Sequence, residues 1–204
     1  MIELAVFLGN PGSRYARTRH NIAMRLAETF AARRGEQFQQ KFQGRLATYR
    51  AGSAGARGGG PGGGVARKLL LLLPQTYMNR SGESAGACAR YHSIEAQDVL
   101  VAHDEVELSF GTLELRRGGG LAGHNGLRSV SQHLSSRNFA RLRVGIGRPA
   151  RGDVSSHVLG TFSPDEEARL DELAGAVESL IERLATEDFD RLAGDIGKHV
   201  VFEW

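Results

Sequence analysis

A chain of 204 residues with 41% hydrophobic and 24% charged residues has the composition of an ordinary globular protein and is long enough to bury one sizeable core. Even the run of five leucines at residues 69–73 is far too short to cross a bilayer, and the N-terminus shows no secretory signal pattern. The single cysteine, Cys88, excludes an internal disulfide and a cysteine-ligated zinc site. We therefore expect a cytoplasmic protein without membrane attachment.

Charge is divided unevenly along the chain, although the net charge is only +3. Residues 111–151 hold eight arginines against one glutamate, a net charge of +7, whereas residues 163–190 hold ten acidic residues against two arginines, a net charge of −8. An arginine-rich segment is the electrostatic footprint expected for a polyanionic partner. A set of solvated surface arginines would give the same count, so the charge alone leaves both interpretations open.

Strand and helix patterns alternate through the first part of the chain. An apolar strand at residues 2–8 is followed by the turn Gly9-Asn10-Pro11-Gly12, a helix at 21–34 that ends at Gly35, and a strand at 42–50. The glycine-rich segment at 51–64 has few side chains to bury, and we predict a flexible surface loop there. No Lys-Ser/Thr pair follows its glycines at the spacing of a phosphate-binding loop.

The alternation continues to the C-terminus. We predict strands at 68–73, 99–102, 112–117 and 139–146, and helices at 81–91 and from 125 to about 134. The last long helix starts at Ser163-Pro164-Asp165-Glu166, a capping-box pattern with proline at the first helical position. This order predicts a single domain over residues 1–204, a three-layer α/β/α globule around a mixed, twisted sheet, with a C-terminal helical segment from residue 163.

Polar residues follow several of the predicted strands. Asn10 follows the first strand, Asn79 comes soon after the leucine strand, and His103-Asp104-Glu105 follows the strand at 99–102. Together with His20 and with His124-Asn125, they offer an imidazole base, a carboxylate to orient it, and amides to bind carbonyl groups. The spacing of the histidines fits no common metal-ligand pattern, and the Gly-x-Ser-x-Gly elbow of many serine hydrolases is missing, so we predict no metal and no serine nucleophile.

Four separated motifs closely resemble those of bacterial peptidyl-tRNA hydrolases. They are Gly9-Asn10-Pro11-Gly12 with Tyr15 and Thr18-Arg19-His20-Asn21; Pro74-Gln75-Thr76-Tyr77-Met78-Asn79; His103-Asp104-Glu105; and Gly118-Gly119-Gly120 with Gly123-His124-Asn125-Gly126. The resemblance covers roughly residues 1–190, in order and at suitable spacing. It implies an α/β fold and an enzyme that needs no cofactor and cleaves the ester between a peptide and the 3′ ribose of tRNA, which recycles prematurely released peptidyl-tRNA.

The resemblance also implies roles for individual residues. His20 is expected to be the general base and Asp104 to orient it, while Asn10 resembles the position that distinguishes blocked from free aminoacyl ends. The expected substrate-binding residues are Asn79 and Asn125 near the peptide and terminal adenosine, Tyr15 and Tyr77 near the 3′ end, and Arg116 and Arg143 as a clamp for the tRNA 5′ phosphate. The family resemblance further implies a monomer.

The sequence differs from the usual family pattern at two places, and two other functions are compatible with parts of it. Ala122 stands where the family usually has another glycine, and the segment at 51–64 is longer than usual. A relative that binds RNA without hydrolysing it would share the fold, and a general esterase or peptidase would share the catalytic residues. The retained polar set favours the enzyme over the first rival, and the arginine-rich segment favours a tRNA substrate over the second.

Overall fold

A computed structural model describes residues 1–51, 67–149 and 152–203, so nearly all of the predicted loop at 51–64 lies outside the described residues. One eight-stranded sheet runs through the molecule in the order β2-β3-β4-β1-β5-β7-β6-β8. The strands are β1 (Leu4–Phe7), β2 (Gln39–Lys41), β3 (Gly44–Arg50), β4 (Lys68–Pro74), β5 (Val99–Glu105), β6 (Thr112–Arg117), β7 (Ala140–Gly145) and β8 (Lys198–Val200).

The sheet is mixed, as the sequence predicts. The four central strands β4, β1, β5 and β7 are parallel to one another, and Leu4 of β1 pairs with Leu70 on one side and Val99 on the other. The outer strands β2, β3, β6 and β8 are all paired antiparallel. The carboxyl ends of the parallel strands therefore share one edge of the sheet, which is where the polar residues after β1, β4 and β5 meet.

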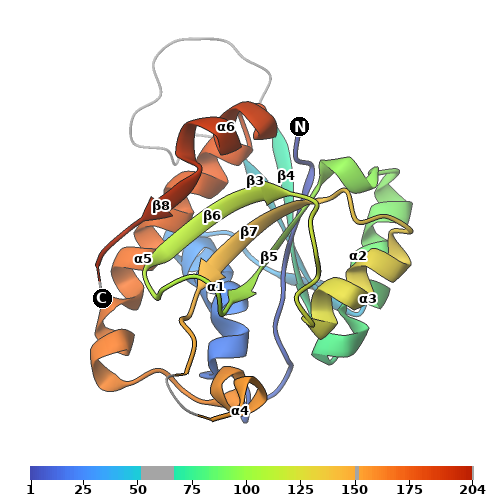
Figure 1. The fold of residues 1–204 in the computed structure, drawn as a ribbon. Helices are drawn as coiled ribbons and strands as arrows, with labels where there is room; N and C mark the ends of the chain where they lie inside the picture. The colour runs from blue at the N-terminus through green and yellow to red at the C-terminus, as the bar shows by residue number, and fades with distance from the viewer. Residues whose placement is uncertain (52–66, 150–151, 204) are drawn as a thin grey trace.

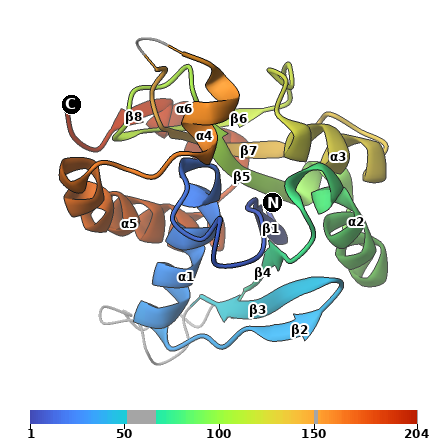
Figure 2. The ribbon, with the colours of Figure 1, turned by 90° about the horizontal axis from the view of Figure 1, so that it is seen from below.

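Helices cover both faces of the sheet, which confirms the three-layer arrangement (Figures 1 and 2). They are α1 (Ile22–Arg34), α2 (Ser81–His92), α3 (Asn125–His133), α4 (Val154–Leu159), α5 (Pro164–Leu184) and α6 (Phe189–Ile196), with the 3₁₀ turns η1 (Arg19–Asn21), η2 (Met78–Arg80) and η3 (Ala96–Asp98). Helices α1, α5 and α6 pack on one face, α2 and α3 pack on the other, and α4 lies at the end towards which β5 and β7 run.

Strict alternation along the central strands divides the core into two clusters. In β5, Leu100 and Ala102 belong to the cluster on the α1 side, whereas Val99 and Val101 belong to the cluster on the α2 and α3 side. The same two-residue period continues beyond Ala102, so consecutive residues at the end of β5 point to opposite faces. The strand thereby delivers Asp104 to the face on which α1 begins.

Four short elements were not predicted from the sequence: β2, β8, α4 and α6. Strands β2 and β8 have three residues each, all exposed, so they lack the apolar alternation that identifies a strand. Helix α4 has six residues and none of them is buried. Strands β2 and β8 and helix α4 exist because longer neighbours position them, and their local sequence carries little of that information. Helix α6 does have local signals, with Asp188 as its N-cap and Phe189 and Leu192 buried.

The acidic helix α5 is fixed to the basic helix α1. Arg33 contacts Glu178 at 3.1 Å and Arg34 contacts the same carboxylate at 2.9 Å, while Arg25 pairs with Glu167. The negative segment found in the sequence is therefore largely paired within the molecule. None of the helices in the described parts of the chain combines the length and the apolar character that a membrane span requires.

A close approach of α2 to α3 depends on Gly82. Its backbone N–H donates to Ser129 Oγ at 2.9 Å, and a Cβ at this position would lie only 2.1 Å from the Ser129 carbonyl oxygen. Gly82→Ala should therefore force the two helices apart and lower the free energy of unfolding by about 1–3 kcal/mol or more.

Gly194→Ala in α6 is the matched control, because a Cβ there meets no atom of the described residues within 4 Å. The control should raise the free energy of unfolding by about 0.5–1 kcal/mol, since alanine is the better helix former. Urea unfolding of both variants measures the two effects, and equal stabilities would contradict the packing argument.

Candidate active site

A cleft of about 540 Å³ opens at the carboxyl edge of the parallel strands. Its walls come from the segment after β1, the turns η1 and η2, the end of β5, strands β6 and β7, the glycine loop between β6 and α3, and helix α4. The lining includes eight of the nine site residues predicted from the sequence, namely Asn10, His20, Tyr77, Asn79, Asp104, Arg116, Asn125 and Arg143. The topology thus gathers residues that are up to 133 positions apart in the chain, from Asn10 to Arg143.

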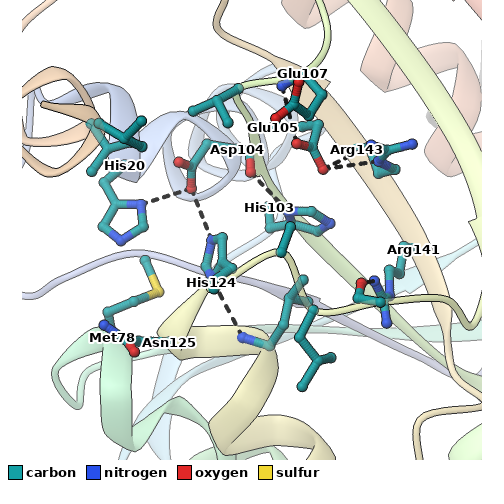
Figure 3. A pocket seen from close by; sticks show the side chains of 18 of the residues that line it. His20, Met78, His103, Asp104, Glu105, Glu107, His124, Asn125, Arg141 and Arg143 are labelled. Atoms are coloured by element: carbon teal, nitrogen blue, oxygen red, sulfur yellow. Dashed lines mark hydrogen bonds and ion pairs between the residues drawn. The ribbon is translucent and has the colours of Figure 1, made fainter. Parts of the chain in front are cut away.

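A buried carboxylate is the centre of the cleft. His20 Nδ1 lies 2.8 Å from Asp104 Oδ1, and His124 Nε2 lies 3.1 Å from the same oxygen (Figure 3). The side chain of Asp104 is only 2% exposed. Burial by itself raises the pKa of this carboxyl, but the two histidines outweigh burial and hold the pKa of Asp104 below its usual range. Asp104 is therefore ionised at neutral pH and accepts a hydrogen bond from each ring.

The proton positions of both rings follow from their partners. His124 is the N-cap of α3, and its Nδ1 accepts from the backbone N–H groups of Gly126 at 3.1 Å and Leu127 at 3.3 Å. Since an amide N–H can only donate, the proton of neutral His124 is on Nε2, which donates to Asp104. His20 donates to Asp104 from Nδ1 in the same way, which leaves its Nε2 unprotonated and available as a base.

Asn10 is held from two sides. Its Oδ1 accepts from the Met78 amide at 2.8 Å, and its backbone is bound reciprocally by Asn21, with 2.8 Å from Asn10 N to Asn21 Oδ1 and 2.8 Å from Asn21 Nδ2 to the Asn10 carbonyl. Because the oxygen of the Asn10 side chain is engaged, its NH₂ group is the part left to donate to a ligand in the cleft.

The residues predicted to bind the tRNA 3′ end lie at the rim. Tyr77 is 56% exposed, and its ring meets Tyr15 edge-on with 6.4 Å between the centroids. Asn79 and Asn125 are also exposed and line the cleft. Of the predicted set only Tyr15 is not among the lining residues, and it reaches the cleft through its contact with Tyr77.

The two arginines predicted as a clamp differ in their surroundings. Arg143 donates to Glu105 Oε2 from Nε at 3.0 Å and also pairs with Glu114 through Nη1, so its charge is shared between two carboxylates. Arg116 is exposed, and within the described parts of the chain it has no ion-pair partner. The structure therefore brings both arginines to the cleft but leaves only Arg116 with an uncompensated charge.

Sequence reasoning assigned no role to Arg141, which the structure shows fixing the glycine loop. Its guanidinium donates to the carbonyls of Gly120 at 2.6 Å and Gly119 at 2.9 Å, and the residue is only 4% exposed. The clue in the sequence was weak, an arginine between the apolar residues Ala140 and Leu142 of a predicted strand, and the glycines that it binds lie 21 and 22 positions earlier in the chain. In the same loop Ala122 has φ +46°, a left-handed conformation that costs a non-glycine residue about 1 kcal/mol.

The ligating atoms of His20, Asp104 and His124 lie within 4.8 Å of one another, a spacing that a metal ion can bridge. The hydrogen bonds do not suit that role. A metal on His124 Nε2 would remove the proton from that atom while Nδ1 still accepts from two amides, which leaves an imidazolate. The chemistry of the donor set therefore favours a hydrogen-bonded triad, and the absence of a metal stays a prediction.

Comparison with known proteins supports one family. The family model described as peptidyl-tRNA hydrolase matches residues 4–200. The peptidyl-tRNA hydrolase of Geotalea daltonii is 42% identical over 187 residues, which are 91% of each chain, and that of Mycobacterium tuberculosis is 43% identical over 185 residues, 88% of this chain and 91% of the other. The crystal structure of peptidyl-tRNA hydrolase from Acinetobacter baumannii is similar with a TM-score of 0.81 and 36% identity, covering 96% of this chain and 94% of that one.

The buried His103 predicts how stability depends on pH. Its Nδ1 donates to the Asp104 carbonyl at 2.8 Å, and burial, helped by neighbouring His124, lowers the pKa of His103 to about 3. Between pH 6.5 and about 3, His103 is protonated in the unfolded chain but stays neutral in the folded protein. Stability should therefore fall as pH falls through this window, by up to about 1.4 kcal/mol per pH unit for this one proton.

His103→Asn tests this expectation, because the asparagine amide can still donate to the Asp104 carbonyl. Urea unfolding between pH 4 and 7 should show a shallower pH dependence in the variant than in the wild type, whatever its absolute stability. Parallel curves for the two proteins would show that His103 does not carry the effect.

Proposed function

As this chain belongs to the peptidyl-tRNA hydrolase family and hydrolyses peptidyl-tRNA, we propose that His20 is the general base of the reaction and that Asp104 orients it. The observation that carries the proposal is the 2.8 Å contact between His20 Nδ1 and the buried, ionised Asp104, which leaves His20 Nε2 free on the cleft side. A neutral imidazole with a fixed tautomer is the usual means of activating water near neutral pH.

The chemistry follows from that tautomer. His20 Nε2 takes a proton from water as the water oxygen bonds to the ester carbonyl carbon. The NH₂ group of Asn10 donates to the carbonyl oxygen, whose negative charge grows in the transition state. The bond to the 3′ oxygen of the ribose then breaks, and that oxygen receives the proton from His20. The products are a tRNA with a free 3′ hydroxyl group and a peptide carboxylic acid, which loses its proton to solvent and becomes a carboxylate.

The exposed rim supplies the substrate contacts in this proposal. Tyr15 and Tyr77 offer aromatic surface for the terminal base of the acceptor end, since stacking on a ring is worth about 1–3 kcal/mol per base. Asn79 and Asn125 offer amides for the peptide and the terminal nucleotide. In this proposal Arg116 meets a phosphate near the tRNA 5′ end, and Arg143, which also lines the cleft, is the second member of the clamp.

We also propose where the enzyme acts and in which assembly state. Peptidyl-tRNA arises at ribosomes, so we place the activity in the cytoplasm. We further propose that residues 1–204 act as one domain and as a monomer, because every group of the proposed catalytic set comes from one chain.

His20→Ala should lower kcat by about 10²–10⁴-fold, because the general base is lost. Asp104→Asn should also lower kcat, since an amide can no longer stabilise the imidazolium that forms during the reaction. Release of a labelled N-blocked aminoacyl group from tRNA measures both. Tm and tRNA binding of His20→Ala should stay near the wild-type values, and full activity in this variant would refute the proposed mechanism.

The clamp prediction distinguishes the two arginines. Arg116→Ala should raise KM for full-length peptidyl-tRNA with little change in kcat, spare a short aminoacyl-oligonucleotide, and reduce the salt dependence of tRNA binding by about one unit of slope. Arg143→Ala should lower the activity on both substrates, because it leaves Glu105 and Glu114 without their counter-charge.

The control for charge is Arg191→Ala, whose side chain is 81% exposed on α6. It removes the same positive charge away from the cleft and should leave KM for full-length tRNA near the wild-type value. An equal rise of KM in Arg191→Ala and Arg116→Ala would mean that net charge, rather than a located phosphate contact, controls binding.

A further inference from the structure

The turn that carries His20 is too short to hold itself in place. Turn η1 has three residues, and among the described residues its N-cap Thr18 makes no side-chain hydrogen bond to the turn. A single 3₁₀ turn has poorer hydrogen-bond geometry than an α-helix. The turn runs directly into α1, which holds its C-terminal end, and the position of His20 within it also depends on the contacts of the two neighbouring residues, Arg19 and Asn21.

Asn21 provides one anchor, through the two reciprocal hydrogen bonds to the Asn10 backbone described above. Arg19 provides the other, on a different part of the molecule. Its Nη2 contacts Glu166 Oε2 at 2.5 Å, Nη1 donates to the Thr161 carbonyl, and its backbone N–H donates to the Gly160 carbonyl at 2.9 Å. The two side chains of the ion pair are only 13% and 10% exposed.

Glu166 is itself a fixed point. The same Oε2 accepts from the Ser163 backbone N–H at 2.6 Å, and Glu166 N donates to Ser163 Oγ at 3.2 Å, which completes the capping box of α5. The helix that follows buries Leu173, Val177 and other apolar residues in the core on the α1 face. Arg19 is therefore tied to the end of a well-packed helix rather than to a loop.

The ion pair also connects His20 to a wall of the cleft. Gly160 ends α4, whose Val154, Val158 and Leu159 line the cleft, and its carbonyl accepts from Arg19 N. Arg19 thus contacts the end of α4 and the start of α5, and it directly precedes His20 in the chain. Because Arg19 and Glu166 are 147 positions apart, the contact is made only in the folded protein.

From these contacts we propose that the Arg19–Glu166 ion pair is a positioning device for the reaction: it holds turn η1 against the α4–α5 junction and so keeps His20 directed at Asp104. The proposal rests on the assigned role of His20. Arg19 and Glu166 act through His20, and neither is assigned a contact with the substrate.

Glu167 offers a matched control one residue along the same helix. Its carboxylate pairs with Arg25 of α1 and faces Arg17 at 3.6 Å, so it joins α1 to α5 without touching η1. Glu166→Gln and Glu167→Gln both remove one negative charge from the first turn of α5. Glutamine at position 166 can still complete a capping box, so the first variant tests the ion pair and not the helix end.

Hydrolysis of N-blocked aminoacyl-tRNA by the two variants is the test. Glu166→Gln should lower kcat by about 10-fold to 100-fold, the loss expected when a catalytic group shifts by about 1 Å, with KM changed much less than kcat. Glu167→Gln should keep kcat near the wild-type value even if its Tm falls. Equal kcat values in the two variants at a temperature well below both Tm values would overturn the proposal.

A double variant tests the route through His20. In a His20→Ala background Glu166→Gln should cause no further loss of residual activity, because the group that it positions is gone. The same fold-loss in both backgrounds would mean that Glu166 acts elsewhere and would overturn the proposal, while full activity of His20→Ala alone would instead refute the assigned base. Arg19→Lys, which keeps the charge but not the forked donor geometry, serves if Glu166→Gln does not fold, and its kcat should also fall.

Discussion

A single buried negative charge organises the cleft. Asp104 sits at the end of a fully buried strand, and among the described residues the desolvation of its carboxylate is offset by hydrogen bonds from His20 and His124 to one oxygen. The His124 ring is in turn fixed at its other nitrogen by the amides that begin α3, and the backbone of His20 is held through its neighbours Arg19 and Asn21. The need to satisfy one carboxylate therefore determines how two helices begin.

The sheet makes this arrangement available because it brings alternating residues of β5 to opposite faces. His103 turns away from Asp104 and stays neutral in the core, with Nδ1 donating to the Asp104 carbonyl. Arg141 of β7 lies on the same face of the sheet as His103, and it donates to the glycine loop that leads to His124. Residues that touch no substrate in our scheme thus hold both the strand end and the loop in position around the catalytic pair.

Electrostatics in the arginine-rich segment differ from what the net charge indicates. Of its members, Arg143 is shared between Glu105 and Glu114, Arg141 binds carbonyls and Arg117 pairs with Asp190 at 2.8 Å. A count of +7 along the chain therefore becomes a smaller amount of unpaired positive charge. Among the described residues of the segment, Arg116, Arg128 and Arg137 have no ion-pair partner, and of these three Arg116 lines the cleft. For a polyanionic substrate this favours a local contact over broad attraction, since paired charges contribute little to the field at a distance.

The amino-acid sequence by itself determined the fold class and the long helices, because strand periodicity, helix periodicity and caps are carried by neighbouring residues. Its ordered motifs indicated the family, and the pairing of His20 with Asp104 came from the resemblance to that family. The start of α5, for example, follows from Ser163 and Pro164. Only the tertiary structure decided which arginine keeps a free charge, that His124 shares the Asp104 oxygen, and that Arg19 meets Glu166. Those contacts join residues 20 to 147 positions apart, and no local pattern encodes a partner that the packing of the sheet and helices brings into reach.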